Sequence, residues 1–120
     1  MKPTARSLLG LAALVLTISA ASQWWSARQR AQIGAQVAAL AQAGDIRMLA
    51  SETCSICASA RVWFTQNRIP FSECLIERDA ACRADFLASA SPGTPVLQVR
   101  GRNFVGFSPG TVLEALRLGR

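Results

Sequence analysis

The sequence contains no histidine, and its four cysteines form only one C-x-x-C pair, Cys54 and Cys57. A structural zinc site needs four ligands, usually from two such pairs or from cysteine–histidine combinations. The other cysteines, Cys74 and Cys82, are eight residues apart and do not form a second pair of this kind. The sequence therefore argues against a bound metal ion.

The sequence also lacks a cluster of positive charge, although thirteen basic and seven acidic residues give a net charge of +6. Residues 1–45 hold four basic and one acidic residue, and residues 46–120 hold nine and six, so each part contributes +3. Nucleic-acid binding requires a stripe of basic side chains that neutralises neighbouring phosphates. The arginines here are scattered, so we expect a solvated basic surface and no nucleic-acid partner.

Charge is absent from residues 7–27, a run of 21 residues that follows a short tail with Lys2 and Arg6. One interpretation is a signal peptide with a cleavage site of small residues at 19–21. The other is a transmembrane helix about 31 Å long, which is enough to cross the hydrocarbon layer. In both interpretations the rest of the chain leaves the cytoplasm.

Trp24 and Trp25 favour the transmembrane interpretation, because tryptophan is enriched where a helix leaves the membrane. We therefore expect residues 1–25 to be an uncleaved signal anchor that contacts membrane lipid through residues 7–25. The short basic N-terminal tail is expected to stay inside. The remainder of this single-pass chain would then face the periplasm or another extracytoplasmic space.

Residues 26–45 are rich in alanine and glutamine, and Ile33, Val37 and Leu40 recur within them at helical spacing. Gly44 follows this run and is a stop signal for a helix. The segment is predicted to be a helical stalk or linker that continues the membrane helix outward. Its apolar stripe could equally pack against the following domain or against a partner helix.

Residues 46–120 alternate between strand-like and helix-like patterns and form one predicted domain. Asp79 and Ser108 are the expected N-cap residues of its last two helices. The order βαβ followed by ββα predicts an α/β fold with a four-stranded mixed sheet flanked by helices. The predicted elements are strands at 46–50, 71–77, 95–100 and 103–106, and helices at 57–68, at 80–88 and from 109 onward.

Several motifs accompany this order: T-C-S-I-C after the first strand, A-x-x-W-F in the helix, I-P-F, T-P-V at 94–96 and G-F-S-P at 106–109. Together they resemble the glutaredoxin branch of the thioredoxin-fold superfamily over about residues 46–118. A lone C-x-x-C pair is a weak signal, but a pair at a strand-to-helix junction followed by T-P-V is specific. The resemblance implies that Pro95 is a cis-proline facing the cysteine pair. It also implies that the substrate is bound by Thr94, Pro95, Gly106 and Phe107.

The position of the C-x-x-C pair predicts its chemistry. A permanent disulfide across so small a loop would constrain the unfolded chain little. A helix N-terminus presents unpaired N–H groups and the positive end of the helix dipole, which would stabilise a Cys54 thiolate as the attacking sulfur. Cys57, one turn into the helix, would then resolve the mixed disulfide. Both cysteines are therefore predicted to be catalytic, with a disulfide-containing protein substrate and a redox partner protein.

The sequence departs from the glutaredoxin pattern at positions that bear on cofactor use. Many glutaredoxins have Pro-Tyr between the cysteines and a basic residue shortly before them, where this sequence has Ser-Ile at 55–56 and Ser-Glu at 51–52. Pro109 stands near the position of an aspartate that helps to hold glutathione. Because glutathione would lose charge-assisted contacts, we expect no cofactor, with glutathione as the less favoured alternative.

Cys74 lies on a predicted strand and Cys82 in the first turn of a predicted helix, and two interpretations remain open. Free cysteines are often buried as small core residues. Alternatively the two form a second disulfide, which an oxidising compartment would permit.

Two functions of different classes fit these patterns. The first is a membrane-anchored thiol–disulfide oxidoreductase that acts on protein or low-molecular-weight disulfides. The alternative is a non-catalytic thioredoxin-fold module that docks a partner or carries a metal or an iron–sulfur cluster. A catalyst turns over a disulfide substrate, whereas a carrier binds stoichiometrically and has a metal or spectroscopic signature.

Overall fold

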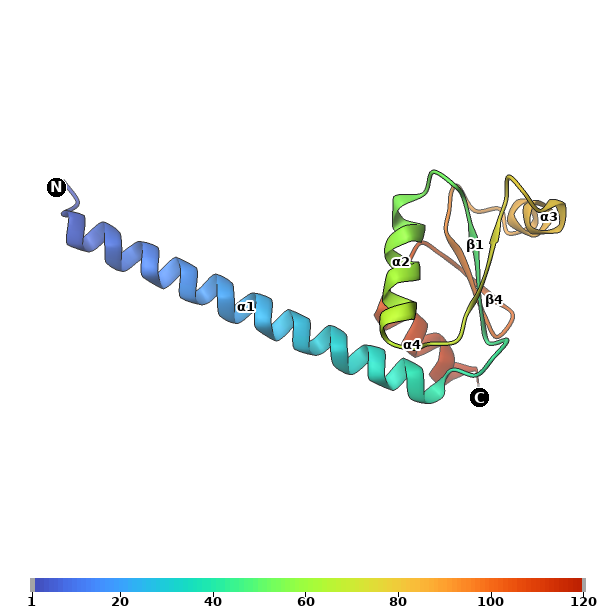
Figure 1. Ribbon diagram of the computed structural model, residues 1–120, viewed down its shortest axis with the longest axis horizontal. Coiled ribbons are helices and arrows are strands. Elements are labelled where there is room, and N and C mark those ends of the chain that lie inside the picture. Colours follow the sequence, from blue (N-terminus) through green and yellow to red (C-terminus); the bar gives the residue numbers. More distant parts are fainter. Residues whose placement is uncertain (1, 120) are drawn as a thin grey trace. The chain divides into compact units, whose positions relative to one another are not determined.

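The computed structural model describes residues 2–119 (Figure 1). The chain divides into two compact units, one that ends at Ala31 and one that begins at Gln32. The second unit therefore begins within residues 26–45, the segment predicted to be a stalk. The first long helix, α1 (Ala5–Leu40), supplies most of the first unit and the beginning of the second.

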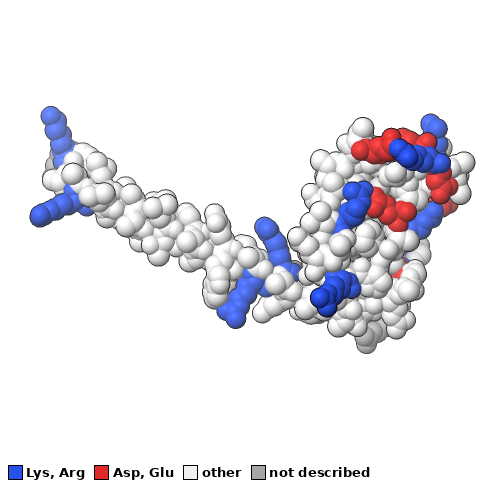
Figure 2. Space-filling model, viewed as in Figure 1, with Lys and Arg blue, Asp and Glu red and all other residues white. Residues whose placement is uncertain are grey.

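In the first unit α1 carries an exposed apolar surface. It is long and apolar enough to span a membrane, and none of its most apolar window is buried. Figure 2 shows this stretch as a white surface with blue basic groups before and after it. At the end of the stretch the Arg28 guanidinium lies 4.8 Å from the centre of the Trp24 ring. Exposed apolar surface of this extent marks an interaction site in a soluble protein and is the normal surface of a membrane helix.

The second unit is built on a four-stranded mixed sheet with the order β2-β1-β3-β4. Strands β1 and β2 are parallel, whereas β3 is antiparallel to both β1 and β4. The predicted order of strands and helices is confirmed, and so is the α/β class. The strands are β1 (Ile46–Ala50), β2 (Ser72–Leu75), β3 (Val96–Val99) and β4 (Arg102–Val105), and the helices are α2 (Ser55–Gln66), α3 (Ala80–Ala88) and α4 (Pro109–Leu118).

Some element boundaries differ from the predicted ones by one or two residues. Helix α2 begins at Ser55, because Cys54 already serves as its N-cap. The hairpin between β3 and β4 turns at Arg100 and Gly101, both with positive φ (48° and 81°), as a two-residue hairpin loop requires. Ser108 precedes α4 as predicted, but its side chain makes no capping hydrogen bond. Pro109 at the first helical position needs no such partner for its missing N–H group.

One face of the sheet is covered by α2, α4 and the C-terminal end of α1, and it holds the main core (Figure 1). Phe64 of α2 is fully buried there, stacked against Phe71 and edge-on to Phe107. This aromatic group fixes α2, and with it the position of the helix N-terminus. The buried residues of this face are Val37, Ile46, Met48, Ala50, Cys57, Ala60, Phe64, Ile69, Leu97, Val99, Val112, Leu113, Ala115 and Leu116.

The C-terminal end of α1 belongs to this core. Val37 is fully buried, and Gly34 approaches α2 so closely that a Cβ there would overlap the side chain of Asn67. The Arg100 guanidinium donates to the Leu40 and Leu116 carbonyl oxygens (3.4 and 2.7 Å). Residues 32–40 therefore pack against the domain, which is one of the interpretations that the sequence left open.

The Arg100 guanidinium also pairs with the Asp45 carboxylate at 3.2 Å. This hydrogen bond, together with one from the Gln42 backbone N–H, holds the pKa of Asp45 below its ordinary value. The pair of Arg100 and Asp45 therefore stabilises the turn between helix α1 and strand β1.

The opposite face of the sheet is covered by α3 alone, and its core is small (Figure 1). Leu49, Cys82 and Val96 are buried, with Phe86 packed against them. Asp79 caps α3, because its carboxylate accepts the Cys82 backbone N–H at 3.1 Å. Polar and covalent links supplement this small core: an ion pair of 2.6 Å between Arg47 and Asp85 and a disulfide between Cys74 and Cys82.

Candidate active site

The C-x-x-C pair lies where β1 ends and α2 begins. Cys54 has an extended backbone (φ −90°, ψ 107°), and its Sγ accepts the Cys57 backbone N–H at 3.1 Å. The two cysteines form a disulfide with a Cα–Cα distance of 5.3 Å. Cys54 is partly exposed, whereas Cys57 is fully buried. Of the two cysteines, only Cys54 therefore presents exposed surface to an external reactant.

The sheet register places Thr94 and Pro95 at the same edge as the cysteine pair. Val96 is paired with Leu49 near the end of β1, so the residues before Val96 lie beside the start of the loop that leads to Cys54. The Thr94–Pro95 bond is cis; Pro95 is buried and Thr94 partly exposed. The structure thus brings these two predicted substrate-binding residues to the cysteine edge.

Gly106 and Phe107 follow β4. The Gly106 N–H donates to the Pro95 carbonyl oxygen at 2.9 Å, which ties this segment to the residue before β3. Gly106 has φ +82°, a conformation that favours glycine. Phe107 is half-buried, with its ring 5.5 Å from Trp63 and 5.6 Å from Phe64. Phe107 therefore packs against α2, and only part of its side chain is exposed.

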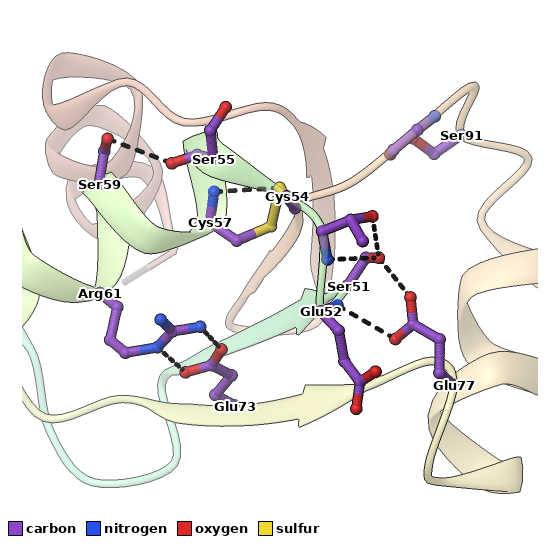
Figure 3. Close-up of a disulfide and its surroundings, with 12 residues drawn as sticks. Ser51, Glu52, Cys54, Ser55, Cys57, Ser59, Arg61, Glu73, Glu77 and Ser91 are labelled. Carbon is purple, nitrogen blue, oxygen red and sulfur yellow. Dashed lines mark hydrogen bonds and ion pairs between the residues drawn. A yellow bond between two sulfur atoms is a disulfide. The ribbon is translucent and has the colours of Figure 1, made fainter.

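A polar network surrounds the loop 51–54, which we call the redox loop (Figure 3). The Ser51 hydroxyl donates to the Glu77 carboxylate, and the Glu52 backbone N–H donates to the other oxygen of Glu77 at 3.3 Å. The Glu52 carboxylate pairs with the Arg78 guanidinium. The Ser51 hydroxyl is the main cause of a lowered Glu77 pKa, and the backbone N–H groups and Arg78 add to the effect.

Glu77 and Arg78 were not among the site residues predicted from the sequence. A signal was present, because the C-terminal ends of two parallel strands meet at one edge of a sheet. Glu77 and Arg78 follow β2 just as Ser51 and Glu52 follow β1, and β1 and β2 are parallel neighbours.

The second pair of cysteines is joined by a disulfide with a Cα–Cα distance of 6.0 Å. Cys74 lies on β2 and Cys82 in the first turn of α3, and an Arg47 guanidinium nitrogen lies 3.5 Å from the Cys74 Sγ. This disulfide belongs to the α3 face of the sheet, whereas Cys57 belongs to the α2 face. Within residues 2–119 no group of three or more cysteine, aspartate or glutamate side chains is placed to hold a metal ion.

Comparison with solved structures identifies the fold. The crystal structure of a mutant of the thioredoxin-like protein BC3987 superimposes with a TM-score of 0.56 and is 24% identical in sequence. The match covers 62% of this chain and 96% of that chain. No protein-family model and no curated protein sequence matches this chain. The chain therefore has a thioredoxin-like fold, with a C-x-x-C-spaced pair that suits a redox-type function.

Proposed function

We propose that this chain is a membrane-anchored, glutaredoxin-like thiol–disulfide oxidoreductase in which Cys54 is the nucleophile and Cys57 the resolving cysteine. The observation that carries the proposal is the asymmetry of the pair: the partly exposed Cys54 caps α2, and the buried Cys57 is its disulfide partner. A helix N-terminus stabilises a thiolate, because its N–H groups point toward the sulfur.

The reaction consists of two exchange steps that balance in electrons. The Cys54 thiolate attacks one sulfur of a substrate disulfide, forms a mixed disulfide and releases the other sulfur as a thiolate. Cys57 then attacks the Cys54 sulfur as a thiolate and releases the second substrate thiolate. The Cys54–Cys57 disulfide of the structure is the product, and two electrons have passed to the substrate. A dithiol protein reverses both steps when it reduces the chain again.

The surroundings of Cys54 favour a protein disulfide over glutathione as the reactant. Glu52 lies in the redox loop, where many glutaredoxins carry a basic residue, and the Glu77 carboxylate lies against this loop. Glutathione carries two carboxylates, and acidic groups near the nucleophile repel them. An extended segment of a protein substrate can instead lie along Thr94 and Pro95, as the resemblance implies. We therefore propose protein disulfides as the main substrates and a redox protein as the electron donor.

The tether and the compartment are part of the same proposal. The uncharged part of α1 has the length and composition of a single membrane span, and the basic tail before it favours retention of the N-terminus in the cytoplasm. The domain would then face the periplasm or another extracytoplasmic space. A second disulfide, Cys74–Cys82, fits such an oxidising compartment, because cytoplasmic thiols are kept reduced.

Turnover of a protein disulfide tests the proposal. The full-length chain in detergent should accelerate the reduction of insulin disulfides by dithiothreitol, and Cys54→Ser should abolish the acceleration. Ser59→Ala is the matched control, because Ser59 is an exposed serine on the same helix and should keep full activity. A chain that adds nothing to the rate of dithiothreitol alone, or that purifies with stoichiometric metal, would instead support the carrier function.

A further inference from the structure

The two disulfides of this chain are connected through the segment between Cys74 and Cys82. The disulfide between Cys74 and Cys82 closes a ring of nine residues, because the two cysteines are eight positions apart in the sequence. We propose that Glu77, in the middle of this ring, is a positioning residue for Cys54, and that the Cys74–Cys82 disulfide holds Glu77 against the redox loop. The proposal deepens the proposed function by assigning a task to the second disulfide.

The first contact between the ring and the redox loop is made by Glu77. Its carboxylate accepts the Ser51 hydroxyl and the Glu52 backbone N–H (Figure 3). Ser51 in turn holds the rest of the loop, because its carbonyl oxygen accepts the Cys54 N–H at 3.3 Å and its Oγ accepts the Thr53 N–H at 3.4 Å. A continuous chain of hydrogen bonds therefore leads from Glu77 to the backbone of Cys54.

Two further contacts come from residues next to Glu77. Arg78 pairs with the Glu52 carboxylate, and the Ile76 N–H donates to the Ala50 carbonyl oxygen at 3.0 Å. Three consecutive residues of the ring thus bind three consecutive residues, 50–52, that lead to Cys54. These contacts hold the redox loop against the ring.

The disulfide fixes the ring at both ends. Cys74 is paired with Leu49 in the sheet, and Cys82 is buried in the first turn of α3. Without the bond, α3 would be held mainly by a three-residue core and by the ion pair between Arg47 and Asp85. Segments with so few buried apolar contacts open locally before the rest of a domain. The turn that carries Glu77 would therefore be the first part to move.

The position of the redox loop matters because Cys54 depends on it for its contact with α2. The Cys54 Sγ faces the Cys57 N–H only while the loop keeps Cys54 at the N-cap position. A loosened loop would weaken this contact and with it the stabilisation of the thiolate. Glu52, Glu77 and Arg78 are the charged groups that face the loop from the loop itself and from the ring.

Alkylation of Cys54 measures this positioning without any disulfide substrate. In the full-length Cys57→Ser chain, Cys54 is the single free thiol and the Cys57 backbone N–H is retained. The rate of reaction with iodoacetamide against pH reports the thiolate fraction, and it can be measured whether or not the chain turns over insulin. Failure of the proposed function and failure of this inference are therefore distinguishable.

Ser51→Ala removes the hydroxyl that donates to Glu77 and accepts the Thr53 N–H, without a change of charge, and it leaves the Glu52 N–H contact with Glu77 in place. In the Cys57→Ser chain it should move the midpoint of the alkylation profile up by about half a pH unit, which lowers the rate about threefold at a pH well below both midpoints. Glu73→Gln is the matched control, because this carboxylate lies on β2, just before the ring, and pairs with Arg61 instead of the redox loop. The control should leave the profile unchanged.

Removal of the second disulfide should act through the same contact. Cys74→Ser with Cys82→Ser should shift the midpoint in the same direction, and adding Ser51→Ala should shift it no further. If the double variant does not fold, Cys74–Cys82 is instead reduced in the folded Cys57→Ser chain with a phosphine, and the Cys54-containing peptide is followed by mass spectrometry. Shifts that add, or a profile that Ser51→Ala leaves unchanged, would overturn the proposal.

Discussion

The two faces of the sheet differ in what holds the helices against them. The face under α2, α4 and the end of α1 buries fourteen core residues, whereas the face under α3 buries three. The larger face is held by apolar burial, which contributes about 25 cal/mol per Å². On the smaller face a disulfide and an ion pair supplement a core too small to hold a nine-residue helix alone.

The Cys54–Cys57 pair is connected to both faces. Cys57 is part of the large core, so its position is as fixed as that of Phe64. The loop that carries Cys54 is instead held from the small face, through Glu77 and Arg78. A fixed Cys57 therefore lies beside Cys54, whose loop is held by contacts from the α3 side of the sheet.

Two phenylalanines provide the sharpest test of the difference between the faces. Phe64→Ala should destabilise the domain by about 3–5 kcal/mol, because a fully buried aromatic ring leaves a cavity in a dense core. Phe86→Ala on α3 should cost about 1–2 kcal/mol, since its ring is only partly buried. Urea unfolding of the two variants checks both values. Equal losses of unfolding free energy in the two variants would mean that the two faces contribute equally to stability.

Removal of the Cys74–Cys82 bond should have the next largest effect. Closing a nine-residue loop is worth about 2.5 kcal/mol in the chain-entropy account. In Cys74→Ser with Cys82→Ser, the amides of α3 should exchange hydrogen faster than those of α2, because the bond supports only the small face. Hydrogen-exchange mass spectrometry follows both helices in one sample. A uniform increase across the domain would contradict a local role for the bond.

Val37→Ala tests whether the end of α1 contributes to the large face. The change removes buried apolar volume and should cost about 2 kcal/mol. Val62→Ala is the matched control: this valine lies on α2, is 53% exposed, and should change stability by less than about 0.5 kcal/mol. If urea unfolding gives the same small loss for both, residues 32–40 are a stalk and not part of the folded domain.

The smallest expected effect is an acid dependence at the join between α1 and β1. The pKa of Asp45 is lowered in the folded state, so its stabilisation is complete above its unfolded value of about 3.8 and is lost as the pH falls through the folded value. The pair with Arg100 should contribute about 0.5–1 kcal/mol at pH 7. Asp45→Asn should remove this contribution and flatten the loss of stability below about pH 4 in urea unfolding. If Asp45→Asn leaves the acid loss of stability unchanged, other carboxyl groups cause that loss.

The order of elements could be predicted from the sequence because each element carries its own period and its own boundary residues. Asp79 caps α3 as predicted, since a cap needs only a side chain and the next three residues. The predicted strands 95–100 and 103–106 placed the hairpin turn one residue late, because the turn begins at Arg100. The Arg100 guanidinium donates to the carbonyl oxygens of Leu40 and Leu116, which are far away in the sequence. Local patterns contain no information about such partners.

The candidate site was predictable in part for the same reason. Cys54 and Cys57 belong to a single motif between a predicted strand and a predicted helix, so the sequence alone indicated that both lie at the start of that helix. The contact of Ser51 with Glu77 joins two loops 26 residues apart and depends on the pairing of β1 with β2. The pairing of Cys74 with Cys82 remained open, because a spacing of eight residues suits buried thiols as well as a disulfide.

The most direct test of the central claim is the trapping of mixed disulfides. Cys57→Ser keeps the nucleophile and removes the resolving thiol, so the full-length chain should accumulate mixed disulfides with a protein disulfide substrate through Cys54. Cys54→Ser should accumulate few or none, because Cys57 is buried. Non-reducing electrophoresis followed by mass spectrometry of the linked peptides reads out both variants. Equal trapping by the two variants, or none by Cys57→Ser, would contradict the assignment of Cys54 as the nucleophile.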